Sequence, residues 1–227
     1  MIQIEKIETS NLLNAIRGMR NPMNSWDKMD SYQEEGHIFV GENDLSLMKK
    51  LCRAGEPHRK FLRQIFICCD ITAPIYWWKE FDTYKIGTTT DSCSTMHRLH
   101  SREIEESDFS MDHLMPGWKK VITDQIMPAL NQAREMYLKT GDKDYWWQMI
   151  QLLPSSYNQK RTVTMNYEIV FNIVKYRLGH KLDEWNNFIS IMFKQLPILP
   201  DLYYATMDEE KDSSMFHYFV EKERNER

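Results

Sequence analysis

The chain has 227 residues, of which 42% are hydrophobic and 27% are charged, and its formal net charge is −4. A chain of this length can bury one substantial core, which favours a single domain over residues 1–227. The mildly acidic balance excludes bulk, sequence-independent nucleic-acid binding, because such binding needs an excess of Lys and Arg facing phosphate. The low glycine count of 8 favours long helices over a strand-and-turn architecture.

The sequence contains no C-x-x-C pair, no secretory leader and no apolar run long enough to span a bilayer. We therefore expect a cytoplasmic protein, with no membrane association, whose thiols are reduced. His97 and His100 lie one helical turn apart, and Cys93 lies a turn before them. No carboxylate at a ligand spacing completes a metal site, so we expect ordinary histidines and no metal. The cysteines are Cys52, Cys68, Cys69 and Cys93.

The N-terminal segment predicts a strand followed by a helix. Residues 1–8 alternate apolar and polar side chains, which is typical of a strand. Ser10 is suited to cap a helix over residues 10–19, whose apolar side chains recur at helical spacing. Residues 20–36 have the composition of a loop.

A second helix, a buried strand and a third helix follow. Asn43 opens the second helix, and Gly55 ends it. Residues 61–71 are rich in aromatic and β-branched side chains and predict a buried strand. Pro74 fits the first turn of the third helix, which we expect to end at Gly87.

The third helix carries an aromatic stripe at helical spacing, formed by Trp77, Phe81 and Tyr84. Core packing is the better interpretation of that stripe. Beyond it, Thr88 and Asp91 have capping-box spacing, which indicates either a plain helix start or a helix N-terminus that receives a phosphate.

The second half of the chain is mostly helical. After an irregular segment at residues 107–120, the pattern predicts a long helix disturbed at Pro128. Together these elements predict a helix-rich α+β domain with a small mixed or antiparallel sheet. The remaining elements expected are helices over residues 118–139, 144–153, 166–178 and 182–195, a strand over 156–165, and a frayed charged tail at 221–227.

Two polar residues stand on the apolar stripe of the helix over residues 166–178. The buried stripe contains Val170, Ile173 and Val174. Asn166 lies on the same side, and so does Arg177, because eleven residues at about 100° each return nearly to the starting direction. Polar groups on a buried face are costly unless something polar meets them. An internal salt bridge, a subunit contact and a polar ligand all fit this pattern.

Several segments resemble the flavin-dependent thymidylate synthases. The sequence A-P-I-Y at residues 73–76 is similar to a family segment that precedes the signature R-H-R-x-x-S-x-N-x-x-S-x-R. The resemblance covers roughly residues 1–200 as a pattern rather than as strong identity. The positions that fall at the family's spacing in the second half are Leu153, Pro154, Thr164, Asn166 and Arg177, with Trp185 after one inserted residue.

The signature itself is largely replaced. Lysine, threonine and cysteine keep some of the chemistry of the arginine and serines that they replace, and the other substitutions do not. Downstream, Glu168 stands where the family has an arginine, which reverses a charge that would favour phosphate. The altered signature positions are Thr83, Tyr84, Lys85, Thr88, Thr90, Cys93 and Thr95.

The resemblance implies a thymidylate synthase-complementing-protein-like fold and an enzyme that forms dTMP from dUMP. In that family FAD carries a hydride from NADPH, methylenetetrahydrofolate donates the carbon, and active sites form between subunits of a homotetramer. Arg177 matches the arginine that contacts the pyrimidine and polarises it for hydride addition. No enzyme nucleophile is required, so the resemblance does not make Cys93 one.

The resemblance also implies binding roles for other positions. Asn166 would position the pyrimidine nucleotide, and Cys93 would stand near it in place of a serine. Lys85, with Arg98 or Arg161, would hold the phosphate. Toward FAD, the resemblance implies Thr88, His180 and Lys181.

Two other hypotheses stay open. In the first, the chain is a non-catalytic homologue that binds a nucleotide or a protein partner. In the second, Asn166 and Arg177 make subunit contacts only. The loss of arginines in the signature favours these alternatives, because each lost charge-assisted hydrogen bond is worth about 1.5–3 kcal/mol.

Overall fold

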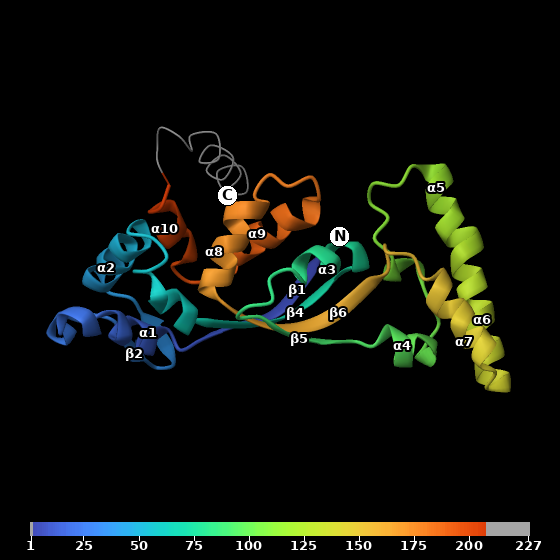
Figure 1. Cartoon of the computed structure of the whole chain (residues 1–227), viewed down its shortest axis with the longest axis horizontal. Helices are drawn as coiled ribbons and strands as arrows, with labels where there is room; N and C mark the ends of the chain where they lie inside the picture. The colour runs from blue at the N-terminus through green and yellow to red at the C-terminus, as the bar shows by residue number, and fades with distance from the viewer. Residues whose placement is uncertain (1, 208–227) are drawn as a thin grey trace. The chain divides into compact units, whose positions relative to one another are not determined.

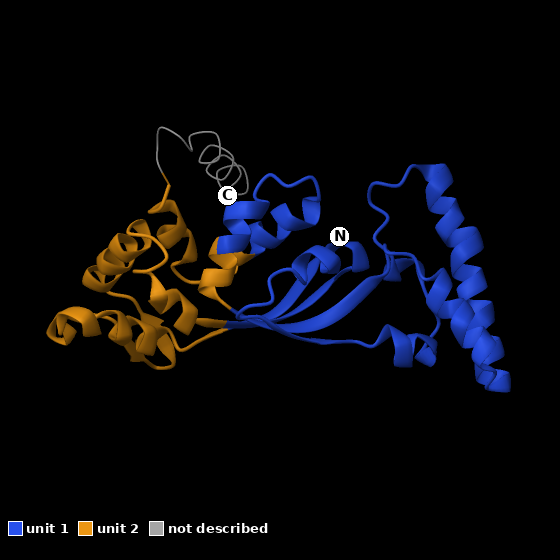
Figure 2. Ribbon diagram, in the orientation of Figure 1, with its two compact units in different colours: residues 1–8, 67–165, 172–191 blue, residues 9–66, 166–171, 192–227 orange. Residues whose placement is uncertain are grey.

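The computed structural model describes residues 2–207, so the predicted tail at 221–227 lies outside the described residues. The chain forms two compact units, each assembled from separate segments (Figure 2). Because neither unit is one continuous stretch, the chain is not divided into consecutive domains, and a single domain over residues 1–227 stays a prediction. Of the described residues, unit 1 contains 2–8, 67–165 and 172–191, and unit 2 contains 9–66, 166–171 and 192–207.

A small sheet and a hairpin make up the β structure of residues 2–207. The sheet has four strands in the order β1-β4-β6-β5, and β5 runs antiparallel to β6 with Ser92 opposite Arg161. The hairpin pairs β2 with β3. The strands are β1 Gln3–Ser10, β2 Tyr32–Glu34, β3 His37–Phe39, β4 Phe66–Pro74, β5 Thr89–Ser92 and β6 Asn158–Asn166.

Most of the remaining structure is helical, which confirms the predicted helix-rich α+β class. None of the helices in residues 2–207 combines the length and apolarity that a bilayer crossing requires. The helices are α1 Leu12–Met19, α2 Glu42–Arg53, α3 Ile75–Phe81, α4 Thr95–Arg98, α5 Pro116–Val121, α6 Met127–Thr140, α7 Lys143–Leu152, α8 Tyr167–Arg177, α9 Asp183–Gln195 and α10 Leu199–Tyr204.

The sheet of unit 1 is covered by helices on one face. Along β4, Ile67, Cys69 and Ile71 are buried, and the two residues between them are half-buried. This alternation is expected when one face of a sheet packs on a core. Helices α3 and α9 lie over that sheet, together with the last turns of α8 (Figure 1). They bring the buried rings of Trp77 and Trp185 together, with centroids 4.7 Å apart.

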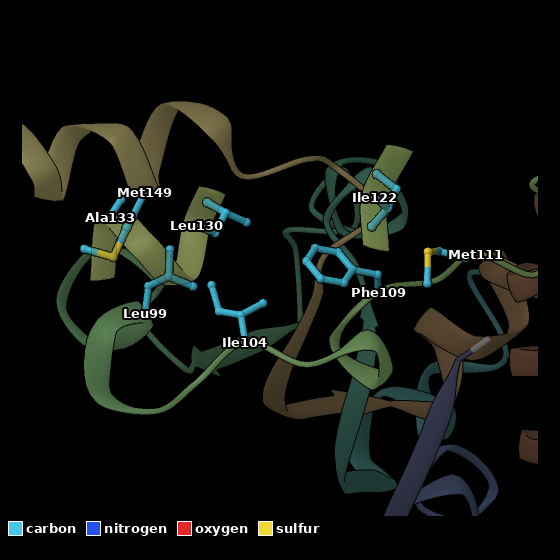
Figure 3. Close-up of a cluster of buried hydrophobic side chains, with 8 residues drawn as sticks. All are labelled: Leu99, Ile104, Phe109, Met111, Ile122, Leu130, Ala133 and Met149. Atoms are coloured by element: carbon cyan, nitrogen blue, oxygen red, sulfur yellow. The ribbon is translucent and has the colours of Figure 1, made fainter. Parts of the chain in front are cut away.

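A second hydrophobic cluster of unit 1 joins helices α6 and α7 to the segment after α4 (Figure 3). The predicted disturbance at Pro128 is confirmed: a π-helical turn, Ile122–Ile126, separates α5 from α6. Proline lacks the N–H that would continue the α-helical ladder, which accounts for the irregular turn before it. The buried members of the cluster are Leu99, Ile104, Phe109, Met111, Ile122, Leu130, Ala133 and Met149.

Two predictions near the N-terminus are wrong. Ser10 is the last residue of β1 rather than a helix cap, and the left-handed Asn11 (φ 67°) precedes α1 without a side-chain cap. Residues 20–36 are not all loop, because β2 lies within them. The turn that joins β2 to β3 has positive φ at Glu35 (49°) and Gly36 (84°), the conformation that suits a two-residue hairpin.

Two boundaries around β4 also differ from prediction. The apolar run at residues 61–71 starts as a 3₁₀ turn, Lys60–Gln64, and becomes a strand only at Phe66. Helix α3 ends at Phe81 rather than at Gly87. Thr88 therefore begins no helix, because the β-branched threonines after it pair with β6 instead.

Candidate functional site

Arg177, the last residue of α8, is held by α3 and the segment after it. Its Nη1 donates to Glu80 Oε2 at 2.7 Å, and its Nε donates to the hydroxyl of Tyr84 at 3.1 Å. The guanidinium carbon lies 5.0 Å from the ring centroid of Trp185. The Arg177 side chain is 20% exposed, so it is half-buried and fixed rather than solvated. Arg177 therefore faces inward, as predicted, and an internal salt bridge to Glu80 balances its charge.

Glu80 is the centre of this cluster, which we call the arginine cluster and define as Glu80, Tyr84, Arg177, His180 and Trp185. Trp185 Nε1 donates to the same Glu80 oxygen at 3.1 Å, and His180 Nε2 lies 3.6 Å from it. The backbone N–H of residue 182 donates to His180 Nδ1 at 3.1 Å, so the neutral ring carries its proton on Nε2. Two hydrogen-bond donors, Arg177 Nη1 and Trp185 Nε1, therefore converge on one carboxylate oxygen, with the His180 ring next to them.

Aromatic packing makes the wall behind the arginine cluster rigid. Trp77 and Phe81 of the predicted stripe are buried and stack with centroids 5.1 Å apart, which confirms their core role. Tyr84 lies beyond the end of α3, and its ring contacts Trp185 edge-on at 6.0 Å. Sequence reasoning missed Glu80, although an acidic residue one turn before Tyr84 was a signal that could have found it.

A cavity of about 300 Å³ forms a second polar site in unit 1. Two predicted site residues, Cys93 and Arg98, line this cavity with the hydroxyl residues Ser94 and Thr95 of the α4 region. Sequence reasoning did not identify Arg102, which also lines it. Hydroxyl groups and guanidinium groups around a cavity can donate hydrogen bonds to a phosphate.

The cations of this cavity are not equally available. Arg102 is paired with Asp108, and its Nη1 donates to Oδ2 at 2.8 Å. Lys160 is also paired, because its Nζ lies 3.2 Å from Asp70 Oδ2 and 3.3 Å from Glu5 Oε2. The guanidinium of Arg98 has no ion-pair or hydrogen-bond partner among residues 2–207. Arg98 is therefore the cation at this cavity that a bound anion can engage without breaking an ion pair.

Asp70 anchors the wall of the cavity through Lys160. A hydrogen bond from Thr162 at 2.7 Å, and then the hydrogen bond from Lys160, lower the pKa of Asp70 below its usual range. A lowered folded-state pKa adds stability that is present above the unfolded pKa of about 3.9 and lost as pH falls through the folded pKa. We expect urea denaturation to show that the stability advantage of the wild type over Asp70→Asn shrinks below about pH 4. An equal difference at every pH would contradict this assignment.

Arg161 is predicted to hold phosphate, but its guanidinium is already engaged. Its Nη1 donates to Asp82 at 2.7 Å, and its Nε donates to Gln159 at 3.1 Å. The guanidinium carbon lies 4.2 Å from the ring centroid of Trp78. Arg161 thus links β6 to α3 and the residue that follows it, and a phosphate would have to compete with Asp82 for it.

Asn166 belongs to unit 2, whereas Arg177 belongs to unit 1. Asn166 is buried, and its Oδ1 accepts the backbone N–H of Ile169 at 3.1 Å, which caps the start of α8. In the same unit Glu168, which reverses the family's charge, is paired with Arg59 at 2.8 Å. The altered charge of Glu168 is therefore compensated within the chain.

The other predicted residues retain free donors. Lys85 and Lys181 are exposed and have no ion-pair partner among residues 2–207. The hydroxyl of Thr88 is buried without a hydrogen-bond partner in that same range, which costs about 1–3 kcal/mol unless another group satisfies it. Lys85, Thr88 and Lys181 do not line the cavity that Arg98 lines, so these residues offer separate donors to the phosphates of a nucleotide or a flavin. No group of three or more His, Cys, Asp or Glu in the described chain is arranged to hold a metal ion.

No protein-family model matches the sequence, and no curated protein matches it either. Solved structures do match it. Thymidylate synthase X (ThyX) from Helicobacter pylori with FAD and dUMP gives a TM-score of 0.65 at 16% identity, over 92% of this chain and 100% of that chain. A second structure of the Helicobacter pylori flavin-dependent enzyme, also complexed with FAD and dUMP, gives 0.62 at 17% identity, over 90% and 99%.

The UMP/dUMP methylase PolB from Streptomyces cacaoi, bound with 5-Br dUMP, gives a TM-score of 0.60 at 15% identity, over 90% of this chain and 94% of that chain. The match therefore extends over most of each protein. Identities this low establish architecture and leave the chemistry to be argued from the site. This chain has the fold of the flavin-dependent thymidylate synthases.

Proposed function

We propose that this chain is a flavin-dependent methyltransferase that converts dUMP to dTMP and binds the nucleotide in unit 1. The observation that carries the proposal is the half-buried guanidinium of Arg177, fixed by Glu80 and Tyr84 beside the ring of Trp185. An arginine held in this way can hydrogen-bond a pyrimidine carbonyl and stabilise charge that develops there during hydride addition. Proteins of the same fold are crystallised with dUMP or named as UMP/dUMP methylases, which supports the choice of substrate.

The proposal assigns the base to Arg177. It assigns the 5′-phosphate to the free cations of unit 1, among which Arg98 lines the 300 Å³ cavity. Arg98 supplies the unpaired cation there, and Cys93 also lines the cavity, where the proposal gives it no role as a nucleophile. Lys85 and Arg161 do not line the cavity, so they are alternative cations for the phosphate outside it, and Arg161 is the weaker one because Asp82 already engages it. The nucleotide role predicted for Asn166 stays a prediction apart from this unit 1 site, because Asn166 belongs to unit 2, where its carboxamide oxygen caps α8.

We propose FAD as the cofactor, with Thr88, His180 and Lys181 toward it. When bound, FAD supplies the hydride that it takes from NADPH, while methylenetetrahydrofolate donates the carbon. Thr88 and Lys181 would donate to the flavin's phosphates, and His180 would keep its Nε2–H directed at Glu80. We also propose that the protein is a cytoplasmic homotetramer, because the family that the sequence resembles builds its active sites between subunits.

One observation favours a second candidate function, that of a non-catalytic nucleotide-binding homologue. Four arginines that could receive anions are each paired with a carboxylate of the same chain, so few free positive charges are left for a dinucleotide. These arginines are Arg59, Arg102, Arg161 and Arg177.

The two functions are separated by one series of measurements on the purified full chain. The enzyme should show a visible flavin absorption band, gain thermal stability from FAD and dUMP, and form dTMP when NADPH and methylenetetrahydrofolate are added. A protein that is stabilised by dUMP but neither binds flavin nor forms dTMP is the non-catalytic homologue. A protein that responds to neither FAD nor dUMP contradicts both candidates.

A further inference from the structure

Glu80 does more than neutralise Arg177, because half of its carboxylate is unused. Its Oε2 accepts from Arg177 Nη1 and Trp185 Nε1, whereas its Oε1 has no hydrogen-bond partner among residues 2–207. On the other side of the pair, Arg177 Nη2 also lacks a partner in that range. The ion pair therefore keeps one acceptor atom and one donor atom available, and the Glu80 side chain is 33% exposed.

The charge of the pair decides which part of a nucleotide suits it. Arg177 and Glu80 lie 2.7 Å apart and together carry no net charge. A dianionic phosphate brought here would gain from Arg177 but would be repelled by Glu80 at nearly the same distance. A neutral heterocycle with a donor next to an acceptor meets no such repulsion, and it can satisfy both unused atoms.

We infer that Glu80 is a specificity-determining residue: its free carboxylate oxygen accepts the N3–H of a uracil base while Arg177 donates to the neighbouring carbonyl. The inference rests on the proposed function, because it assumes that a uridine nucleotide binds at the arginine cluster. It deepens that proposal by making the negative charge of Glu80, and not only the positive charge of Arg177, responsible for base choice. A base whose N3 position carries no hydrogen leaves this carboxylate oxygen unpaired.

The surroundings fix Glu80 for this task. Trp185 Nε1 and Arg177 Nη1 hold one oxygen, so the carboxylate is not free to turn away. His180 closes the other side of the pair, with its Nε2 lying 3.3 Å from Arg177 Nη1 and 3.6 Å from Glu80 Oε2. A ligand that leaves a buried or half-buried polar group of the site without a hydrogen-bond partner binds much more weakly. Such sites discriminate between similar molecules in this way.

The test compares dUMP with its N3-methyl derivative, which has no N3 hydrogen. Isothermal titration of the wild-type chain should give a dissociation constant roughly 10- to 100-fold higher for N3-methyl-dUMP, the range expected for one charge-assisted hydrogen bond. In Glu80→Ala that ratio should fall to about 1. In Glu80→Gln it should be intermediate, because the amide oxygen still accepts but carries no charge.

A purely structural role of Glu80 would lower the affinity for both nucleotides equally and leave their ratio unchanged, which would overturn the inference. Should Glu80→Ala fail to fold, as judged by circular dichroism, a wild-type ratio in Glu80→Gln would overturn it as well. Glu135→Ala removes an exposed carboxylate of α6 and should keep the wild-type ratio. If the wild type binds neither nucleotide, the proposed function itself fails; if it binds both equally, only the role of Glu80 fails.

Discussion

Replacing Arg177 with alanine is expected to raise the dissociation constant for dUMP by roughly 100-fold. The substitution removes a charge-assisted donor to the base and also leaves the half-buried Glu80 carboxylate without the guanidinium that neutralises it. Arg177→Lys should recover only part of the affinity, because an ammonium group cannot engage Glu80, Tyr84 and a ligand with one planar fork. Isothermal titration with dUMP measures both variants.

Lys175→Ala is the matched control for Arg177, since Lys175 is an exposed cation in the same last turn of α8. It should bind dUMP as the wild type does. Light scattering on the same samples tests the structural alternative. If Arg177→Ala changes the oligomeric state and leaves dUMP affinity intact, Arg177 is a subunit contact and the nucleotide assignment is wrong.

Replacing Asp44 with alanine is expected to destabilise unit 2 by about 3–5 kcal/mol. Asp44 is fully buried, and its Oδ1 accepts from Arg20 Nε at 2.7 Å. Its Oδ2 accepts the backbone N–H groups of Asp30 at 3.0 Å and Ser31 at 2.8 Å. Removing the carboxylate therefore leaves a buried guanidinium, which is 3% exposed, and two backbone donors without their acceptor.

Urea denaturation of the Asp44 variant gives the loss directly. The double variant Arg20→Met, Asp44→Ala should regain part of it, because an apolar side chain removes the unpaired buried charge. Ser46→Ala, at an exposed position of α2, should stay within about 0.5 kcal/mol of the wild type. A loss below about 1 kcal/mol in Asp44→Ala would show that the buried pair contributes little.

Much of the fold was predictable because helical and strand periodicity are local. The stripe of α8, the disturbed helix before Pro128 and the alternation in β1 follow from side-chain spacing within a few residues. The predicted ends of helices and strands were wrong where a local sequence signal competed with strand pairing to a distant segment. Thr88 has a capping-box partner three residues on, yet β5 forms there because it pairs with β6.

The sequence predicted some residues of the candidate site and the orientation of Arg177, but it did not predict the partners of these residues. Spacing correctly turned Arg177 toward the interior, and the family pattern selected Cys93 and Arg98, which line one cavity. Glu80 was missed because its role depends on a residue 97 positions away. Asn166 and Arg177 share one stripe in the sequence, yet they fall in different compact units.

By itself, the sequence determined where the longer helices lie and which side of them is apolar, since periodicity reports on a segment of about ten residues. Only the tertiary structure decided what each inward-facing charge meets: Glu80 for Arg177, Asp82 for Arg161 and Arg59 for Glu168. The physical reason is that an ion pair is set by the distance between two atoms in space, and the partners here come from elements far apart in the chain. Which cations remain free for a ligand is therefore a property of the folded molecule.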